Sequence, residues 1–295
     1  MIMIKGTTTI LGVVGYPIGH SLSPVMHNAA ISHLKADYVY VPFPVKPENL
    51  AAAVRGFEAI DVKGFSVTIP HKQAIIPLLK EITPEAQMTG AVNAVWRIED
   101  GWKGTNYDSF GFIAPLKAMD QDWKNIVPMV LGIGGAARSV VVGCASLGCP
   151  EVHVFGRNPD KLADFVQSWH DTPVQQVLKA HPWDELKGMM SRSKLVVNAT
   201  PMGMYPRVDQ LPVSEEIIGS IQPGTVVYDL IYAPKPTLFL KKAQENGAII
   251  VDGLEMLVQQ GAKALEIWLG RAVPVDIMRE ALLEQSGTAE VGSGK

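Results

Sequence analysis

Cysteine, excess charge and long apolar runs are all scarce in this sequence, and each absence excludes a class of protein. The 295 residues contain two cysteines, Cys144 and Cys149, which are too few for a four-ligand zinc site, so we expect no metal. The net charge of -3 and the isoelectric point near 6.2 give no reason to expect nucleic acid or an anionic membrane as a partner. No apolar run is long enough to span a bilayer, and residues 1–9 lack the layout of a secretory signal. We therefore expect a cytoplasmic protein whose cysteines stay reduced, as small core residues.

The composition is that of an ordinary globular protein. Hydrophobic residues make up 47% of the chain and charged residues 19%, which leaves ample material for a core. The length allows one large domain or two modest ones. The last stretch, residues 286–295, is small and polar, and we expect it to be a disordered tail.

Strand-like and helix-like segments alternate along the chain, which predicts an α/β fold with parallel sheets. The alternation restarts after Asp108, so the best division between two domains lies near Asn106–Ser109. The second domain is expected to run to about Val251.

Local signals predict three further features in the first part of the chain. Two strands, 91–98 and 102–106, are expected to form a hairpin. Residues 71–82 have the pattern of a helix, with a break or kink at a central proline. Ser23 is expected to be the N-cap of a helix that begins with proline.

The stretch 127–138 predicts a turn that binds a dinucleotide. An apolar strand leads into Gly132, which allows a tight turn, and Gly134 lets the backbone approach a pyrophosphate. Ala137 is small enough for close packing of the following helix on the strand. The amide groups at the start of that helix would hold the phosphates. The alternative is a glycine turn in an α/β core that holds no ligand.

The residue after the next strand indicates which dinucleotide is bound. Residues 151–155 read as that strand, and Arg157 follows it closely. An acidic residue here would bind the ribose hydroxyl of NAD, whereas an arginine suits the 2′-phosphate of NADP. The sequence therefore favours NADP.

Polar side chains gather where the predicted strands end, which is where ligands bind in open α/β sheets. The set supplies hydroxyls, amides, a lysine and carboxylates, and describes a site for a small polyhydroxylated molecule. Its members are Ser21, Ser23, Thr68, Lys72, Asn93, Asn106, Asp108, Asn198, Thr200, Tyr228, Asp229 and Tyr232.

Lys72 and Asp108 are the members that could do chemistry. Hydride transfer to a ketone creates negative charge on oxygen, and a positioned lysine can supply the proton that this oxygen needs. Asp108 could orient the lysine and share a substrate hydroxyl. The alternative is a surface lysine at a helix start and an aspartate that caps a helix, and the residues alone leave both interpretations open.

Motifs in a fixed order along nearly the whole chain resemble those of the shikimate dehydrogenases. Besides the glycine turn they are GYPIGHSLSP at 15–24, VTIPHK at 67–72, GAVN at 90–93, NYD at 106–108, NATPMG at 198–203, YDLIY at 228–232 and DGLEMLVQQ at 252–260. The resemblance implies NADPH-dependent reduction of 3-dehydroshikimate to shikimate, a step toward aromatic amino acids. It also implies a mixed α/β substrate domain of residues 1–107 plus 252–285, a Rossmann-type NADP domain of 108–251, and a cleft between them. As a partner it implies a small-molecule substrate, in a monomer or homodimer.

The resemblance assigns a role to each site residue. Lys72 is the acid and base, with Asp108 as its partner. Ser21, Ser23 and Tyr232 hold the substrate carboxylate, and Thr68, Asn93, Asp108 and Gln260 hold its hydroxyls. The cofactor is held by Gly132, Gly134, Gly135, Ala136, Ala137, Asn198, Thr200, Met202 and Gly253, with Arg157 and Lys161 facing the 2′-phosphate.

The chain departs from the family pattern at two places. The family usually has Asn-Arg-Thr where this chain has Gly156, Arg157 and Asn158. Threonine commonly precedes the catalytic aspartate, where Tyr107 stands here. One alternative is therefore a quinate/shikimate dehydrogenase that uses both NAD and NADP. Another is a non-catalytic NADP-binding sensor, which would be expected to lose the lysine or the aspartate.

Overall fold

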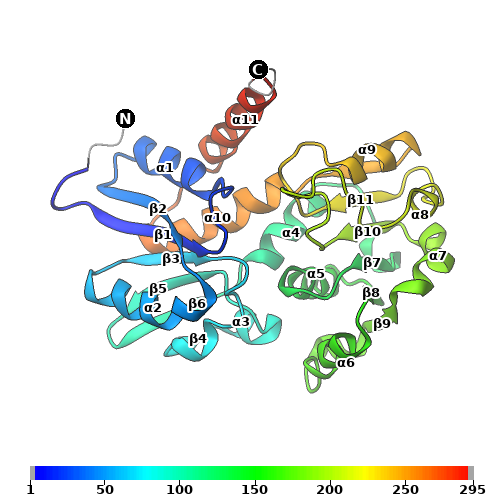
Figure 1. The fold of residues 1–295 in the computed structure, drawn as a ribbon, viewed down its shortest axis with the longest axis horizontal. Helices are drawn as coiled ribbons and strands as arrows, with labels where there is room; N and C mark the ends of the chain where they lie inside the picture. Colours follow the sequence, from blue (N-terminus) through cyan, green and yellow to red (C-terminus); the bar gives the residue numbers. More distant parts are fainter. Residues whose placement is uncertain (1–3, 292–295) are drawn as a thin grey trace. The chain divides into compact units, whose positions relative to one another are not determined.

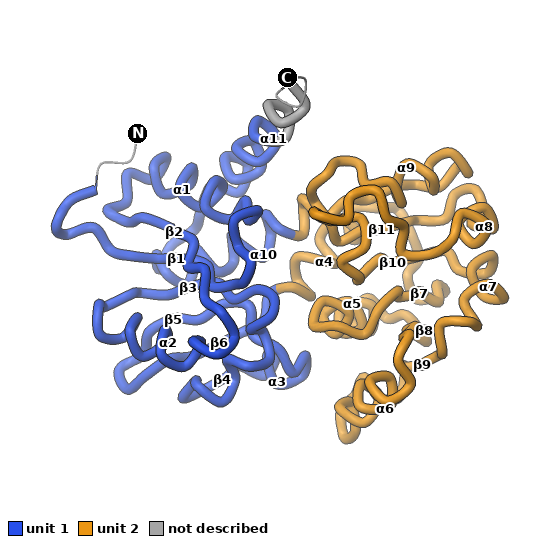
Figure 2. The backbone as a smooth tube through the Cα atoms, in the orientation of Figure 1, with its two compact units in different colours: residues 1–107, 257–295 blue, residues 108–256 orange. Residues whose placement is uncertain are grey.

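The structure, a computed structural model, describes residues 4–291, with side chains described as far as Gln285. The chain forms two compact units, coloured separately in Figure 2. Unit 1 takes the residues up to Tyr107 and those from Leu257 onward, and unit 2 spans Asp108–Met256. Both units are α/β, which confirms the predicted fold class.

Unit 1 contains a six-stranded sheet in the order β2-β1-β3-β5-β6-β4. Its strands are β1 (Thr9–Gly15), β2 (Tyr38–Pro44), β3 (Gly64–Val67), β4 (Glu81–Ile82), β5 (Ala94–Ile98) and β6 (Gly101–Thr105). Strand β1 pairs in parallel with β2 and β3, but β5 runs antiparallel to both β3 and β6. The expectation of parallel sheets is therefore wrong for this sheet.

The β5–β6 hairpin explains the mixed sheet. The two strands are joined through Gly101, whose φ of 124° is accessible to glycine and strained for other residues. So short a connection can only join antiparallel strands. The predicted hairpin is confirmed.

The helices of unit 1 cover both faces of its sheet (Figure 1). They are α1 (Ser23–His33), α2 (Leu50–Ala59), α3 (Pro84–Thr89), α10 (Leu254–Leu269), which begins in unit 2, and α11 (Val275–Val291), with short 3-10 turns η1 (Pro47–Asn49) and η2 (Ile76–Leu78). The helix predicted over 71–82 is wrong: this segment holds turns, η2 and β4. Pro77 lies inside η2, and a proline removes a backbone donor that a longer helix needs.

Helix α10 attaches the end of the chain to the sheet of unit 1. The Trp268 indole Nε1 donates a hydrogen bond of 3.0 Å to the Val95 carbonyl in β5. The Trp268 indole lies against Gly64 and occupies the space that a side chain at position 64 would need. His27 of α1 stacks on Tyr40 of β2, and both rings contact Trp268, so three segments distant in sequence share one aromatic cluster.

Unit 2 contains a six-stranded, wholly parallel sheet in the order β12-β11-β10-β7-β8-β9. Its strands are β7 (Pro128–Leu131), β8 (Val152–Gly156), β9 (Leu178–Pro182), β10 (Leu195–Asn198), β11 (Val226–Asp229) and β12 (Ile249–Val251). The chain winds outward from β7 first to one edge and then to the other, which is the Rossmann topology. Every residue of β7, β10 and β11 is buried, as expected for strands covered on both faces.

The connections of unit 2 are helical. They are α4 (Asp108–Lys117), α5 (Gly135–Ser146), α6 (Pro159–Gln167), α7 (Leu186–Met189), α8 (Glu215–Ile218) and α9 (Leu238–Glu245), with 3-10 turns η3 (Trp123–Asn125), η4 (Pro173–Gln176), η5 (Trp183–Glu185) and η6 (Met190–Arg192). The strand order reverses between β7 and β10, because the connection that leaves β7 runs toward one edge of the sheet and the connection that leaves β10 runs toward the other. This is the place where such sheets bind their ligands.

The two cysteines lie at the end of α5. The Cys149 N–H donates 3.1 Å to the Cys144 carbonyl across Gly148, whose φ is 87°, and this is a Schellman cap. Both are buried free thiols, which confirms that they are core residues, and burial raises the pKa of Cys144 well above its usual value. Among residues 4–285, no group of three or more His, Cys, Asp or Glu could hold a metal ion. No helix of the described chain is long and apolar enough to cross a membrane.

The expected tail differs in part from the structure. Helix α11 continues to Val291, so 286–291 are helical, and residues 292–295 lie outside the described residues. Extending an existing helix costs far less than starting one, and Ala289 and Glu290 are good helix formers.

Candidate active site

The glycine turn after β7 has the geometry expected of a phosphate-binding loop. Gly132 has a φ of 107°, and a Cβ there would lie 3.0 Å from Thr200 Cγ2. By contrast, a Cβ built on Gly134 or Gly135 meets nothing within 4 Å, so the backbone at the start of α5 is open to a ligand. Ala137 is fully buried where α5 packs on the sheet. The residues fit a pyrophosphate at this helix N-terminus.

The loop after β10 lies beside the glycine turn and is held by Asn198. The Ala199 N–H donates 3.0 Å to the Leu131 carbonyl, which places the loop next to the end of β7. Asn198 Oδ1 accepts the Thr200 N–H at 3.1 Å and the Thr200 hydroxyl at 2.7 Å. Asn198 Nδ2 donates 3.2 Å to the Met202 carbonyl. Three of the expected cofactor residues therefore form one hydrogen-bonded loop.

Asp229 supports this loop from the neighbouring strand. It is fully buried at the end of β11 and accepts hydrogen bonds from Asn198 Nδ2 at 3.0 Å, the Ile231 N–H at 3.2 Å and the Thr237 hydroxyl at 2.7 Å. Burial raises its pKa from 3.8 to about 7, although the three hydrogen bonds oppose the shift. The sequence placed Asp229 among the polar residues at the ends of strands, but no role was predicted for it.

Gly253 and Tyr232 both follow strands of unit 2. The Gly253 N–H donates 3.1 Å to the Ile231 carbonyl, and a Cβ on Gly253 would collide with the Leu230 carbonyl. Only glycine fits there. Tyr232 is half-buried in the loop that follows β11.

The departures from the family pattern around Arg157 have local causes. A Cβ on Gly156 would lie 2.9 Å from Leu162 Cδ1 and 3.1 Å from Ile133 Cδ1, so an asparagine here would have to displace the ends of these two side chains. Asn158 takes over the capping task of a threonine, because its Oδ1 accepts the Lys161 N–H at 2.9 Å and caps α6.

In unit 1, the loops that follow β1 and β3 converge beside β5. The Thr68 N–H donates 2.9 Å to the Val14 carbonyl, and the Val67 N–H donates 2.8 Å to the Asn93 carbonyl. The Val92 N–H in turn donates 2.8 Å to the Lys72 carbonyl. These backbone bonds bring Thr68, Lys72 and Asn93 into one neighbourhood.

Asn93 and Gln260 meet although 167 positions separate them in the chain. Asn93 Nδ2 donates 3.1 Å to Gln260 Oε1, and Asn93 Oδ1 accepts the Tyr107 N–H at 2.9 Å. Gln260 Nε2 donates 2.8 Å to the Leu257 carbonyl of its own helix. Two amides expected to contact substrate hydroxyls are thus fixed in place before any ligand arrives.

Ser21 and Ser23 lie between β1 and α1. The predicted N-cap at Ser23 is wrong: Ser23 is already the first residue of α1, the cap is Leu22, and no side chain caps the helix. Instead the Ser23 N–H donates 3.3 Å to the Ser21 hydroxyl oxygen. Ser23 is buried and Ser21 half-buried.

The expected site residues are divided between the two units. Unit 1 holds Ser21, Ser23, Thr68, Lys72, Asn93 and Gln260, whereas unit 2 holds Asp108, Tyr232 and the expected cofactor residues. Asp108 opens α4 and is only 4% exposed. Sequence reasoning missed Trp183, whose ring contacts Arg157. A lone tryptophan carries no local signal that could have revealed it.

The fold defines a two-unit protein of the dinucleotide-binding class, because unit 2 has a glycine turn where the strand order of a Rossmann sheet reverses. Two family models match the chain: the shikimate dehydrogenase substrate binding domain at residues 13–95 and the shikimate 5′-dehydrogenase C-terminal domain at 253–283. The chain belongs to the shikimate dehydrogenase family.

Individual relatives match almost the entire chain. The shikimate dehydrogenase (NADP(+)) of Microcystis aeruginosa is 58% identical over 285 residues, which cover 97% of this chain and 100% of that protein. A shikimate dehydrogenase solved in complex with NADP+ is 34% identical, with a TM-score of 0.87 over 96% of this chain and 97% of the other. The Thermus thermophilus shikimate 5-dehydrogenase, solved with NADP(H) and shikimate, is 31% identical, with a TM-score of 0.82 over 94% and 99%.

Proposed function

We propose that this protein is an NADP-dependent shikimate dehydrogenase. It catalyses the reversible reduction of 3-dehydroshikimate to shikimate, in the pathway to chorismate and the aromatic amino acids. The observation that carries the proposal is the 58% identity over 97% of the chain to a relative named for this activity. A location in the cytoplasm stays a prediction.

Lys72 and Asp108 perform the proton transfer in this proposal. When bound, NADPH would supply the hydride that reduces the substrate carbonyl. As negative charge develops on the carbonyl oxygen, the Lys72 ammonium donates a proton to it, and in the reverse direction the neutral amine accepts the proton from the hydroxyl. Asp108 orients the lysine and accepts a hydrogen bond from a substrate hydroxyl.

The remaining polar residues of the two units hold the substrate. Ser21, Ser23 and Tyr232 bind its carboxylate. Thr68, Asn93, Asp108 and Gln260 bind its hydroxyls. The 3.1 Å bond between Asn93 and Gln260 supports this assignment, because preordered amides lose little freedom when a hydroxyl binds.

The residues of unit 2 hold the cofactor. The pyrophosphate is bound by the turn made of Gly132, Gly134, Gly135, Ala136 and Ala137, whose open backbone supports this role. Asn198, Thr200, Met202 and Gly253 would also contact the cofactor. Arg157 and Lys161 bind the 2′-phosphate, a dianion that arginine binds with two parallel hydrogen bonds.

A spectrophotometric assay with two substrates and two cofactors tests the proposal. The purified protein, mixed with shikimate and NADP, should generate the absorbance of NADPH. The same protein is measured with quinate and with NAD, and the Lys72→Ala variant serves as the matched control. Absence of turnover with shikimate under either cofactor would contradict the proposal. Comparable turnover of quinate would identify a quinate/shikimate dehydrogenase, and nucleotide binding without turnover would identify a sensor.

A further inference from the structure

Arg157 is held by two uncharged groups. Its guanidinium lies over the Trp183 ring, 4.7 Å from the ring centroid, and its Nη2 donates 3.2 Å to the Pro212 carbonyl. Among residues 4–285, whose side chains the structure describes, no carboxylate forms an ion pair with Arg157. Stacking on an aromatic face and bonding to a neutral carbonyl both orient an arginine without neutralising its charge.

The register of the parallel sheet places Trp183 beside Arg157. Gly156 at the end of β8 pairs with Pro182 at the end of β9, so the residue that follows each strand lies next to the other. Both positions are at the carboxyl ends of parallel strands, the edge at which such sheets bind nucleotides.

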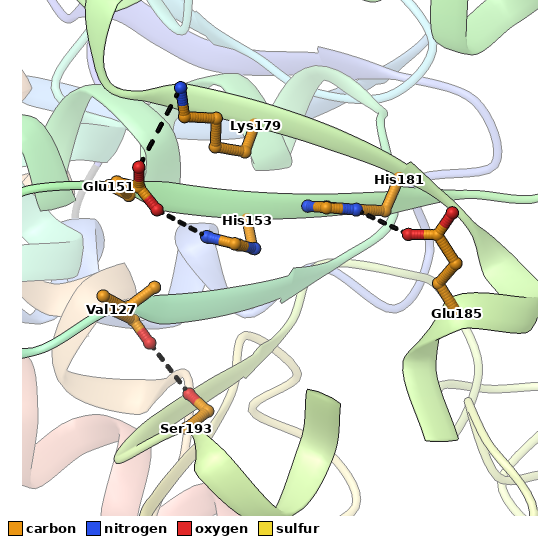
Figure 3. Close-up of polar contacts among 7 residues, drawn as sticks. All are labelled: Val127, Glu151, His153, Lys179, His181, Glu185 and Ser193. Carbon is orange, nitrogen blue, oxygen red and sulfur yellow. Dashed lines mark hydrogen bonds and ion pairs between the residues drawn. The ribbon is translucent and has the colours of Figure 1, made fainter. Parts of the chain in front are cut away.

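The turn that carries Trp183 is itself fixed. Figure 3 shows His181 of β9 and Glu185 of η5, joined by a hydrogen bond of 2.8 Å between Nδ1 and Oε2. The His181 ring also stacks on His153, with centroids 4.8 Å apart, and on Phe155 at 5.2 Å. The indole of Trp183 packs against the hydrophobic core of unit 2. Trp183 is therefore a fixed platform for a side chain that would otherwise be mobile.

We propose that Trp183 is a positioning residue for NADP specificity: it holds the Arg157 guanidinium ready for the 2′-phosphate while leaving its charge available. This inference rests on the proposed role of Arg157 in the cofactor site. A carboxylate partner would compete with the phosphate for the guanidinium, whereas the indole face does not. Holding the arginine in advance removes part of the entropy loss that binding would otherwise incur.

Binding of two nucleotide fragments to the full chain tests the proposal. The fragments are 2′,5′-ADP, which carries the 2′-phosphate, and 5′-ADP, which lacks it, each measured by calorimetry. Trp183→Leu keeps the side chain apolar but removes the aromatic face, and should weaken binding of 2′,5′-ADP about 2- to 10-fold, since ordering a free arginine costs that much. Binding of 5′-ADP should stay unchanged, and Trp183→Phe should restore most of the loss.

Two controls separate positioning from a merely structural effect. In an Arg157→Ala background, Trp183→Leu should cause no further loss of 2′,5′-ADP. Trp169→Phe changes another tryptophan stacked on an arginine in unit 2, Arg138, and should leave both fragments unaffected. Equal losses for both fragments, equal losses in the Leu and Phe variants, or a loss that persists without Arg157 would each overturn the proposal.

The outcome is independent of catalysis. If the wild-type protein oxidises shikimate with NADP but Trp183→Leu binds both fragments normally, this inference fails and the proposed function stands. If the wild-type protein does not oxidise shikimate but loses 2′,5′-ADP selectively on Trp183→Leu, the proposed function fails and the inference stands.

Discussion

Replacing Asp229 by asparagine should change how the stability of this protein depends on pH. Asp229 is fully buried, and its pKa is raised from 3.8 to about 7 mainly because burial disfavours the charged form. A folded-state pKa above the unfolded one means that the native protein binds the proton more tightly than the unfolded chain. The stability from this group is therefore fully present below pH 3.8 and is lost as pH rises through about 7.

The structure gives the size of the effect. At roughly 1.4 kcal/mol per pKa unit, a shift of this kind corresponds to roughly 4 kcal/mol across the whole range and roughly 3 kcal/mol between about pH 5 and about pH 8. Asparagine is nearly the same size and stays neutral. Its oxygen can accept the Asn198 and Ile231 donors, and the Thr237 hydroxyl can turn to accept its N–H. The variant should therefore lack the pH-dependent loss.

Urea unfolding of the cofactor-free protein across that pH range measures this difference. The free energy of unfolding of the wild type, relative to that of Asp229→Asn, should fall by roughly 3 kcal/mol as pH rises from about 5 to about 8. Asp209→Asn, at an exposed aspartate of the same unit, is the matched control and should follow the wild type. Parallel profiles for the wild type and Asp229→Asn would refute the reasoning, as would a carboxyl titration by carbon NMR with a midpoint below about 5, near the ordinary value of an aspartate.

Three further predictions concern catalysis, the cofactor and packing. Lys72→Ala should lower kcat by roughly 10²–10⁴, the usual contribution of a general acid, and a near-normal kcat in steady-state assays would remove Lys72 from this role. Arg157→Ala should raise KM for NADP far more than KM for NAD, because only NADP carries the 2′-phosphate; equal changes would contradict the assignment. Gly156→Asn should destabilise the protein by about 1–3 kcal/mol, since its Cβ would press on Leu162 and Ile133. An unchanged midpoint in thermal unfolding would show that these two side chains move aside at no cost.

Predictions that depended on local backbone conformation agree with the structure. The glycine turn and the β5–β6 hairpin each need a residue with positive φ, and Gly132 and Gly101 provide it. The predictions were wrong where a segment can adopt more than one local conformation. The segment 71–82 has helical spacing but contains a proline, and α1 begins one residue before the expected position.

Sheet pairing and charge environment depended on residues far apart in the chain. The pattern of a strand is the same whether its neighbour is parallel or antiparallel, so the mixed sheet of unit 1 had no signal beyond its hairpin. The raised pKa of Asp229 likewise results from the strands and loops that bury it. The spacing of residues in the sequence does not reveal that Asp229 is buried.

The sequence by itself determined the alternation of strands and helices outside residues 71–82, the glycine turn after β7 and the presence of Arg157 after β8, because these follow from the conformational preferences of a few adjacent residues. Only the tertiary structure decided that Gln260 is hydrogen-bonded to Asn93 and that the Trp183 ring lies against the Arg157 guanidinium. Those contacts form because packing over a whole unit brings distant segments together. The energy of that packing depends on the entire unit and cannot be read from a short stretch of sequence.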